Sequence, residues 1–289
     1  MASLSRTAGE TRYDMTGRDI LIYAATATGP VKYVNEDYYC VNGSVQGAPE
    51  VYRTLMIPGE GRPMGLAAVA DGVSSSGTGA LASEAACALI DVAYNGGYFD
   101  SPEPFDWAML CHELMSCIVR DASFSGDKQT TVSLACFDEN TLFCYNIGDS
   151  PILLFRKNGS VKSAYTEHNA AGEKRAYNAS LTGLDRVLPW KRRQVTDHDE
   201  YVLTRCLRTN AAGNADLGSS SILSWEEGDI LLIASDGVTK KLTTEEMTKL
   251  LEDGSPAEAL VRSACDKGGT DNMTAVVLIN GGGEGSGHN

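Results

Sequence analysis

The stretch Ile230-Leu-Leu-Ile-Ala-Ser-Asp-Gly237 places an aspartate two residues after a run of apolar side chains. A short apolar run that stops at turn-forming residues predicts a buried strand. A carboxylate at the end of such a strand is costly unless water or a partner satisfies it. Asp236 therefore belongs either to a simple Asp-Gly turn or to a functional site.

Three further aspartates, Asp37, Asp71 and Asp271, also lie close to where an apolar strand begins or ends. Each one alone is explained by a turn, since Asp-Gly and Asp-Asn are common turn pairs. Several such carboxylates without matching cysteine or histidine are instead the oxygen ligands that Mg²⁺ or Mn²⁺ prefers. Together they indicate metal-assisted hydrolysis of a phosphate ester. The segments are Asn35-Glu-Asp-Tyr-Tyr-Cys40, Ala67-Ala-Val-Ala-Asp-Gly72 and Gly268-Gly-Thr-Asp-Asn-Met273.

Length and composition are those of an ordinary globular chain, with 289 residues, 43% hydrophobic and 21% charged side chains. No apolar run is long enough to span a membrane, and the opening residues lack the pattern of a signal peptide, so we expect a cytoplasmic location. The formal net charge of −14 disfavours nucleic acid and anionic membranes as partners. Eight scattered cysteines without a Cys-x-x-Cys pair predict reduced core thiols.

Hydrophobic patterns predict an α+β layered domain, because the strands and the helices each come in groups. We expect helices over Gly79–Tyr94 and Pro104–Asp121 and others that begin near Leu242 and at Ser255. The expected organisation is a flexible segment over 1–19, a single domain over 20–280 with a mobile, flap-like insertion over 170–199, and a disordered tail over 281–289. The predicted strands are Ile20–Ala25, Tyr38–Val41, Leu66–Ala70, Thr130–Phe137, Leu142–Ile147, Ile152–Phe155, Ile230–Ala234 and Met273–Ile279.

The acidic segments belong to a longer series of motifs in which the chain resembles the type 2C metal-dependent protein phosphatases, the PPM class, from about residue 20 to residue 280. Each motif alone is unspecific, but the complete series in order is distinctive. The series comprises Val31-Lys-Tyr-Val-Asn-Glu-Asp37, Val69-Ala-Asp-Gly-Val73, Thr130-Thr131, Asn146-Ile-Gly-Asp-Ser150, Thr166-Glu-His168, Tyr201-Val-Leu-Thr-Arg-Cys-Leu207, Ala234-Ser-Asp-Gly-Val-Thr239 and Gly268-Gly-Thr-Asp-Asn-Met-Thr274.

This resemblance implies a four-layer α-β-β-α sandwich, with two central antiparallel sheets flanked by helix pairs and a two-metal centre at one end. It implies a bacterial-like serine/threonine phosphatase that uses two Mg²⁺ or Mn²⁺ ions, whose bridging water attacks phosphoserine or phosphothreonine directly. Asp71 would bridge both ions. The Gly72 carbonyl with Glu36 or Asp37 would bind one ion, and Asp236 with Asp271 the other.

The chain departs from the family pattern at positions that bear on mechanism. Lys32 stands where the family usually has arginine, and it would bind phosphate as a point charge rather than a planar fork. Val73 stands where some members have histidine. Lys240 replaces an acid of an outer, third metal site, and we expect its ammonium to pair there with the retained Asp149. Asp127 is one more candidate for that outer site.

We expect a monomeric signalling enzyme. Its expected partners are phosphorylated proteins, including a cognate serine/threonine kinase and its targets. One alternative is a pseudophosphatase that binds a phosphoprotein or kinase without turnover, which the Lys32 and Lys240 exchanges would explain. A hydrolase of another phosphate ester is also compatible, because a fold does not determine a substrate. The basic residues between Lys174 and Arg193 form either a solvated loop or a docking site for an acidic partner.

Overall fold

The computed structural model describes residues 20–42, 45–46, 50–57, 65–99, 107–209, 213 and 215–281. The predicted flexible segment over 1–19, and all of the predicted tail beyond residue 281, lie outside these residues. No helix in the described ranges is long and apolar enough to cross a membrane. Six of the eight free cysteines are buried, which agrees with the prediction of core thiols.

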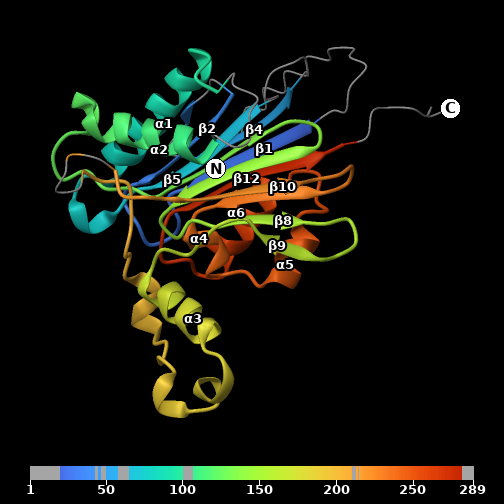
Figure 1. Cartoon of the computed structure of the whole chain (residues 1–289). Helices are drawn as coiled ribbons and strands as arrows, with labels where there is room; N and C mark the ends of the chain where they lie inside the picture. Colours follow the sequence, from blue (N-terminus) through green and yellow to red (C-terminus); the bar gives the residue numbers. More distant parts are fainter. Residues whose placement is uncertain are drawn as a thin grey trace.

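Two antiparallel sheets of six strands each form the centre of the molecule (Figure 1). The first sheet has the order β4-β1-β12-β11-β8-β9, with β4 (Glu50–Ile57), β1 (Ile20–Ala27), β12 (Met273–Asn280), β11 (Ile230–Ala234), β8 (Ile152–Phe155) and β9 (Val161–Ser163). The second has the order β10-β7-β6-β5-β2-β3, with β10 (Ser219–Ser224), β7 (Thr141–Ile147), β6 (Val132–Phe137), β5 (Gly65–Asp71), β2 (Asp37–Val41) and β3 (Val45–Gln46).

Helices cover the outer face of each sheet. Helices α1 (Gly79–Asn95) and α2 (Trp107–Arg120) pack on the second sheet, and α5 (Thr244–Leu250) and α6 (Pro256–Asp266) pack on the first, together with the short α4 (Asp236–Thr239). The predicted four-layer α-β-β-α sandwich is therefore confirmed. Because the inner strands are covered on both faces, their sequences are mostly apolar rather than alternating.

Strand β12 illustrates how one strand serves two layers. Val276 and Leu278 join the core between the sheets, while Ala275 and Val277 join the core under α5 and α6. Successive side chains of a strand point to opposite faces, so both sets are buried. The resulting rigid layers hold the strand ends in place.

The helix that begins near Leu242 is confirmed, and its start is a capping box. The Thr243 hydroxyl accepts a hydrogen bond from Glu246 N, and the Glu246 carboxylate accepts one from Thr243 N at 2.9 Å. Pro256 occupies the first helical position of α6 as expected, but the Ser255 side chain makes no capping hydrogen bond.

Several elements were not predicted. Strand β10 is serine-rich and half exposed, and β9 is wholly exposed, so neither has an apolar pattern. No helix was predicted in the flap-like insertion over 170–199, yet it contains α3 (Ala170–Ser180) and the 3-10 turns η4 (Gly183–Arg186) and η5 (Pro189–Lys191), and η6 (Asp197–Tyr201) begins within it. Figure 1 shows this insertion, in yellow and light orange, extending away from the sandwich. The predicted mobility of the insertion stays a prediction.

Candidate metal centre

Antiparallel pairing brings the four predicted aspartates to one end of the sandwich. In the second sheet, Asp37 at the start of β2 is the register partner of Asp71 at the end of β5. In the first sheet, β11 ends beside the start of β12, with Ala234 opposite Ala275. Asp236 follows β11 and Asp271 precedes β12, so both lie at that shared edge. Residues far apart in the sequence thus meet because neighbouring strands run in opposite directions.

Asn272 joins the two sheets at this end. Its side-chain amide donates hydrogen bonds to the carbonyl oxygens of Thr28 and Val34 at 2.8 and 2.9 Å, and its Oδ1 accepts one from Glu36 N at 2.9 Å. The side chain is 3% exposed, so these bonds form away from water. Asn272 therefore holds the loop that carries Glu36 against the residue next to Asp271. The sequence prediction missed this role because it interpreted Asp-Asn only as a turn signal.

Gly72 lies where no other residue fits. A Cβ atom at this position would lie 2.3 Å from the backbone of Gly79 and 2.7 Å from the carbonyl oxygen of Glu36. The Gly72 amide donates a hydrogen bond to the same Glu36 carbonyl at 3.0 Å. The backbone after Asp71 can therefore approach Glu36 closely, which is a common reason for glycine at a ligand site.

Burial and neighbouring acids disfavour the charged forms of Asp37 and Asp71. Asp37 is fully buried, and neither of its carboxylate oxygens accepts a hydrogen bond of normal geometry. Burial, with smaller contributions from Asp271 and Asp236, raises its pKa to about 7, although nearby hydroxyls partly oppose the shift. The pKa of Asp71 is raised well above its usual value, first by burial and then by the charges of its acidic neighbours.

Lys32 lies among the acids on the outer side of the centre. Its ammonium is 3.1 Å from Asp271 Oδ1 and 3.7 Å from Glu36 Oε2, and it donates to Ser74 Oγ at 2.7 Å. The Ser74 hydroxyl in turn donates to Glu36. Burial lowers the pKa of Lys32, but the bond to Asp271 and the surrounding negative charge outweigh this, so the pKa is raised. Lys32 is therefore a charged group that remains partly open to solvent.

Lys240 contacts Asp236, the metal-ligand candidate that follows β11. Its Nζ lies 2.5 Å from Asp236 Oδ2 and donates to the carbonyl oxygen of Glu200 at 3.1 Å, and it stands 4.3 Å from the centre of the Tyr201 ring. The expected direct partner was Asp149. The ammonium pairs with Asp236 instead. Asp236 is the first residue of α4 and Lys240 follows its last residue, so the two side chains are four residues apart and lie close together.

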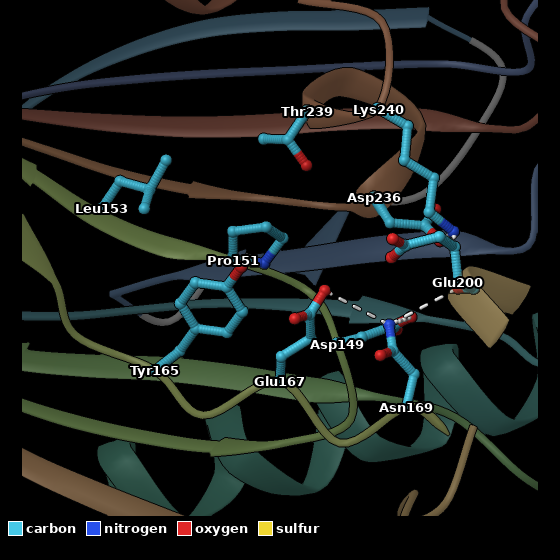
Figure 2. A pocket seen from close by; sticks show the side chains of 10 residues that line it. All are labelled: Asp149, Pro151, Leu153, Tyr165, Glu167, Asn169, Glu200, Asp236, Thr239 and Lys240. Carbon is cyan, nitrogen blue, oxygen red and sulfur yellow. Dashed lines mark hydrogen bonds and ion pairs between the residues drawn. The ribbon is translucent and has the colours of Figure 1, made fainter. Parts of the chain in front are cut away.

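A polar cavity of about 190 Å³ lies beside this pair (Figure 2). Asp149 and Asn169 line one side, and Asn169 Nδ2 donates to Asp149 Oδ2 at 3.2 Å. The pKa of Asp149 is raised to about 7 by burial and by the charge of Asp236, while Lys240 and Asn169 oppose the shift. Lys240 thus influences Asp149 through its charge without a direct ion pair.

Asp127 and His168 have surroundings unlike those of the four aspartates. Asp127 is exposed, and its charge is not among those that raise the pKa of Asp71. His168 is buried, accepts a hydrogen bond from Gly148 N at 3.1 Å through Nδ1, and contacts Ser219 Oγ through Nε2 at 3.0 Å. Both ring nitrogens of His168 are therefore engaged in contacts within the fold.

The chemistry of the cluster fits divalent cations. Within the described part of the chain, no three histidine, cysteine, aspartate or glutamate side chains are already arranged to hold a metal ion. However, Asp37 has buried oxygens without hydrogen bonds, and several carboxylates repel one another. Cations relieve both penalties.

Comparisons with known proteins find similar sequences. The sequence matches the family described as protein phosphatase 2C over residues 59–268. It is 26% identical over 263 residues to the protein phosphatase PhpP of Streptococcus pneumoniae, covering 88% of this chain and 94% of that protein.

Solved structures share the fold. The serine/threonine phosphatase Stp1 of Staphylococcus aureus superposes with a TM-score of 0.68 at 17% identity, covering 96% of this chain and all of that one. The catalytic domain of the phosphatase PstP, solved in complex with two manganese ions, gives a TM-score of 0.62 at 21% identity, covering 90% of this chain and 98% of that one.

Proposed function

The chain belongs to the protein phosphatase 2C family, and from this premise we propose that it hydrolyses phosphoserine and phosphothreonine in phosphoproteins. The observation that supports this proposal most directly is the convergence of Asp37, Asp71, Asp236 and Asp271 at one end of the sandwich, where Asp37 is buried without hydrogen bonds. Such a cluster is suited to bind two Mg²⁺ or Mn²⁺ ions.

We assign the ligands as the family pattern suggests. Asp71 would bridge the two ions, the Gly72 carbonyl with Glu36 or Asp37 would complete one site, and Asp236 with Asp271 the other. When bound, such a metal pair lowers the pKa of a water molecule and neutralises charge on a phosphoryl oxygen. Asn272 and Gly72 would keep the ligands in place, since they determine how closely the Glu36 loop approaches Asp71 and Asp271.

Lys32 is the group that we propose to bind the phosphoryl oxygens. It is charged, partly exposed, and held by Ser74, Glu36 and Asp271 at the outer edge of the cluster. A lysine attracts phosphate as a point charge and imposes less orientation than arginine. Val73 follows Gly72, so no histidine at this position is available to protonate the departing alcohol.

Lys240 is proposed to replace a third cation. Its ammonium pairs with Asp236 and opposes the rise in the pKa of Asp149, and these two are the acids that an outer metal would contact. A permanent positive charge in this position disfavours a further divalent ion by repulsion. Asp127, the remaining candidate for an outer site, is exposed on the surface.

Phosphorylated proteins in the cytoplasm, including a serine/threonine kinase and its targets, are the proposed partners of a signalling enzyme. The relatives described above are all named as phosphatases, so the alternative of a binding module without turnover gains no support from them.

Turnover of p-nitrophenyl phosphate and of a phosphothreonine peptide tests the proposal. We expect activity with manganese or magnesium, none with EDTA, and loss of activity in Asp71→Asn and Asp236→Asn. Asp266→Asn, which changes an exposed acid at the end of α6, is the matched control. Manganese binding is measured calorimetrically on the same variants. Full activity in EDTA, or in Asp71→Asn, would contradict the proposed centre.

A further inference from the structure

The outer end of the insertion exposes large apolar side chains. Within residues 182–194, here called the insertion tip, Leu184, Val187 and Trp190 are 80%, 70% and 76% exposed. They lie on or beside η4 and η5, in the part of the chain that extends away from the sandwich (Figure 1). Apolar side chains that gather on a surface mark contact sites for other molecules. The rest of the described chain leaves these three uncovered.

The same segment is positively charged in an acidic protein. The insertion tip carries Arg186, Lys191, Arg192 and Arg193 against one acid, Asp185, whereas the whole chain has a net charge of −14. Lys191 pairs with that acid, with 3.8 Å between Lys191 Nζ and Asp185 Oδ1. Within the described residues, Arg186 and Arg192 are exposed and have no ion pair. Positive charge concentrated beside apolar side chains favours an acidic partner.

The basic residues nearer to the sandwich have a different role. Lys174 is 2.7 Å from Asp199, and Arg175 is 2.6 Å from Glu167 and also pairs with Glu200. These contacts hold the insertion to its own base. The sequence pattern alone did not separate the two groups, but the structure assigns the free positive charge to the tip.

Side chains of α3 contact the end of the insertion tip at Arg193. Asn178 on α3 donates to the Arg193 carbonyl and accepts from the Arg193 amide, both at 2.8 Å. The Arg193 guanidinium also covers the Tyr177 ring at 4.0 Å. A surface that is ordered before binding loses less conformational entropy when it binds.

We propose that the insertion tip docks an acidic segment of a phosphoprotein substrate, with an aromatic or aliphatic side chain that contacts Leu184, Val187 and Trp190. The proposal rests on the proposed phosphatase function. The docking segment is remote from the phosphorylated residue. The base of the insertion lies at the metal centre, where Lys240 contacts Glu200, and α3 begins beside it through the bond from Ala170 N to the Val202 carbonyl.

The length of α3 determines the distance between the metal centre and the insertion tip. Its 11 residues span about 16 Å at a rise of about 1.5 Å per residue. An extended peptide covers about 3.3 to 3.6 Å per residue. A docking segment therefore lies about five or more residues from the phosphorylated residue, beyond the reach of a short peptide.

Fluorescence anisotropy with the full chain tests this inference. The probes are a long phosphothreonine peptide with an acidic and aromatic cluster about eight residues from the phosphothreonine, the same peptide with serine in place of that cluster, and a short peptide without it. The tip variants are Trp190→Ala and Arg192→Glu. The matched controls are Met109→Ala, which removes another exposed apolar side chain, and Lys162→Glu, which reverses another exposed charge.

We expect the Kd of the long acidic peptide to rise about tenfold in each tip variant, the effect typical of an anchoring side chain. The short peptide, p-nitrophenyl phosphate turnover and the control variants are expected to be unchanged. Equal affinity of wild type for the acidic and serine peptides would overturn the proposal. So would self-association, or binding to phosphatidylserine vesicles, that is lost in Trp190→Ala while peptide affinity is kept. Binding without turnover would remove the proposed function but leave the docking surface.

Discussion

Lys240 Nζ lies 2.5 Å from Asp236 Oδ2, so an acid assigned to the metal centre already has a cationic partner within its own chain. The same ammonium reaches the Glu200 carbonyl at the base of the insertion. One side chain therefore connects the acidic cluster to the insertion. A divalent ion at Asp236 would have to compete with this contact.

The first prediction concerns this competition. Lys240→Met is expected to raise the affinity of the centre for manganese by up to about tenfold, because Asp236 no longer has an ammonium partner within reach. Lys240→Asp is expected to add a separate binding event, since it supplies a carboxylate near Asp149. Isothermal titration calorimetry measures both, with Lys241→Met as the control. Unchanged affinity and stoichiometry in both variants would show that Lys240 does not occupy a cation site.

A second prediction concerns Lys32 as the phosphate-binding group. Lys32→Ala is expected to reduce kcat/KM about tenfold or more, as is typical for loss of a hydrogen bond between charged groups. Lys32→Arg is expected to retain activity because it also presents a cation. Steady-state kinetics on a phosphothreonine peptide measure both, and Lys162→Ala is the surface control. The assignment is wrong if Lys32→Ala is as active as wild type.

Gly237 provides a prediction about packing at the centre. A Cβ atom there would lie 2.0 Å from the carbonyl oxygen of Asn272, a buried residue that cannot move aside freely. Gly237→Ala is therefore expected to lower the free energy of unfolding by about 1 to 3 kcal/mol, the typical cost of overpacking.

The matched control for this packing prediction is Gly254→Ala, where an added Cβ atom meets nothing within 4 Å. Urea denaturation of both variants measures the difference. Equal stability of the two variants would show that the backbone near Asn272 adjusts at no cost.

The pH dependence of stability provides a fourth prediction. Burial, with a smaller contribution from the charge of Arg205, lowers the pKa of His168 to about 4, below its ordinary value of 6.5. The unfolded chain therefore binds the proton more tightly, so the contribution of His168 to stability is complete above about pH 6.5 and is lost as the pH falls toward 4.

This contribution is isolated by comparison with His168→Gln, whose amide does not titrate. Both proteins are measured in EDTA. Between pH 6.5 and pH 4, the Tm of wild type is expected to fall more than the Tm of His168→Gln. Other buried groups titrate in both proteins and cancel in the difference. A difference that is constant with pH would contradict the pKa of His168 given above.

The parts of the fold predicted from sequence are those in which local pattern and burial agree. Strand β11 is wholly apolar and β12 mostly so, because both of their faces are covered. The start of α5 was predicted because Thr243 and Glu246 form their capping contacts within one turn. Strand β10 was missed because Ser219–Ser224 is stabilised by pairing with β7 rather than by its own apolar content.

The candidate site divides in the same way. The sequence by itself determined which carboxylates end or begin strands, because Asp37, Asp71, Asp236 and Asp271 are each next to an apolar run. Only the tertiary structure decided that Lys240 pairs with Asp236 rather than Asp149, and that Asn272 connects the Glu36 loop to the other sheet. The bond between Asn272 and Glu36 joins positions 236 residues apart in the chain. Such a contact depends on the register and packing of whole sheets, which no local pattern specifies.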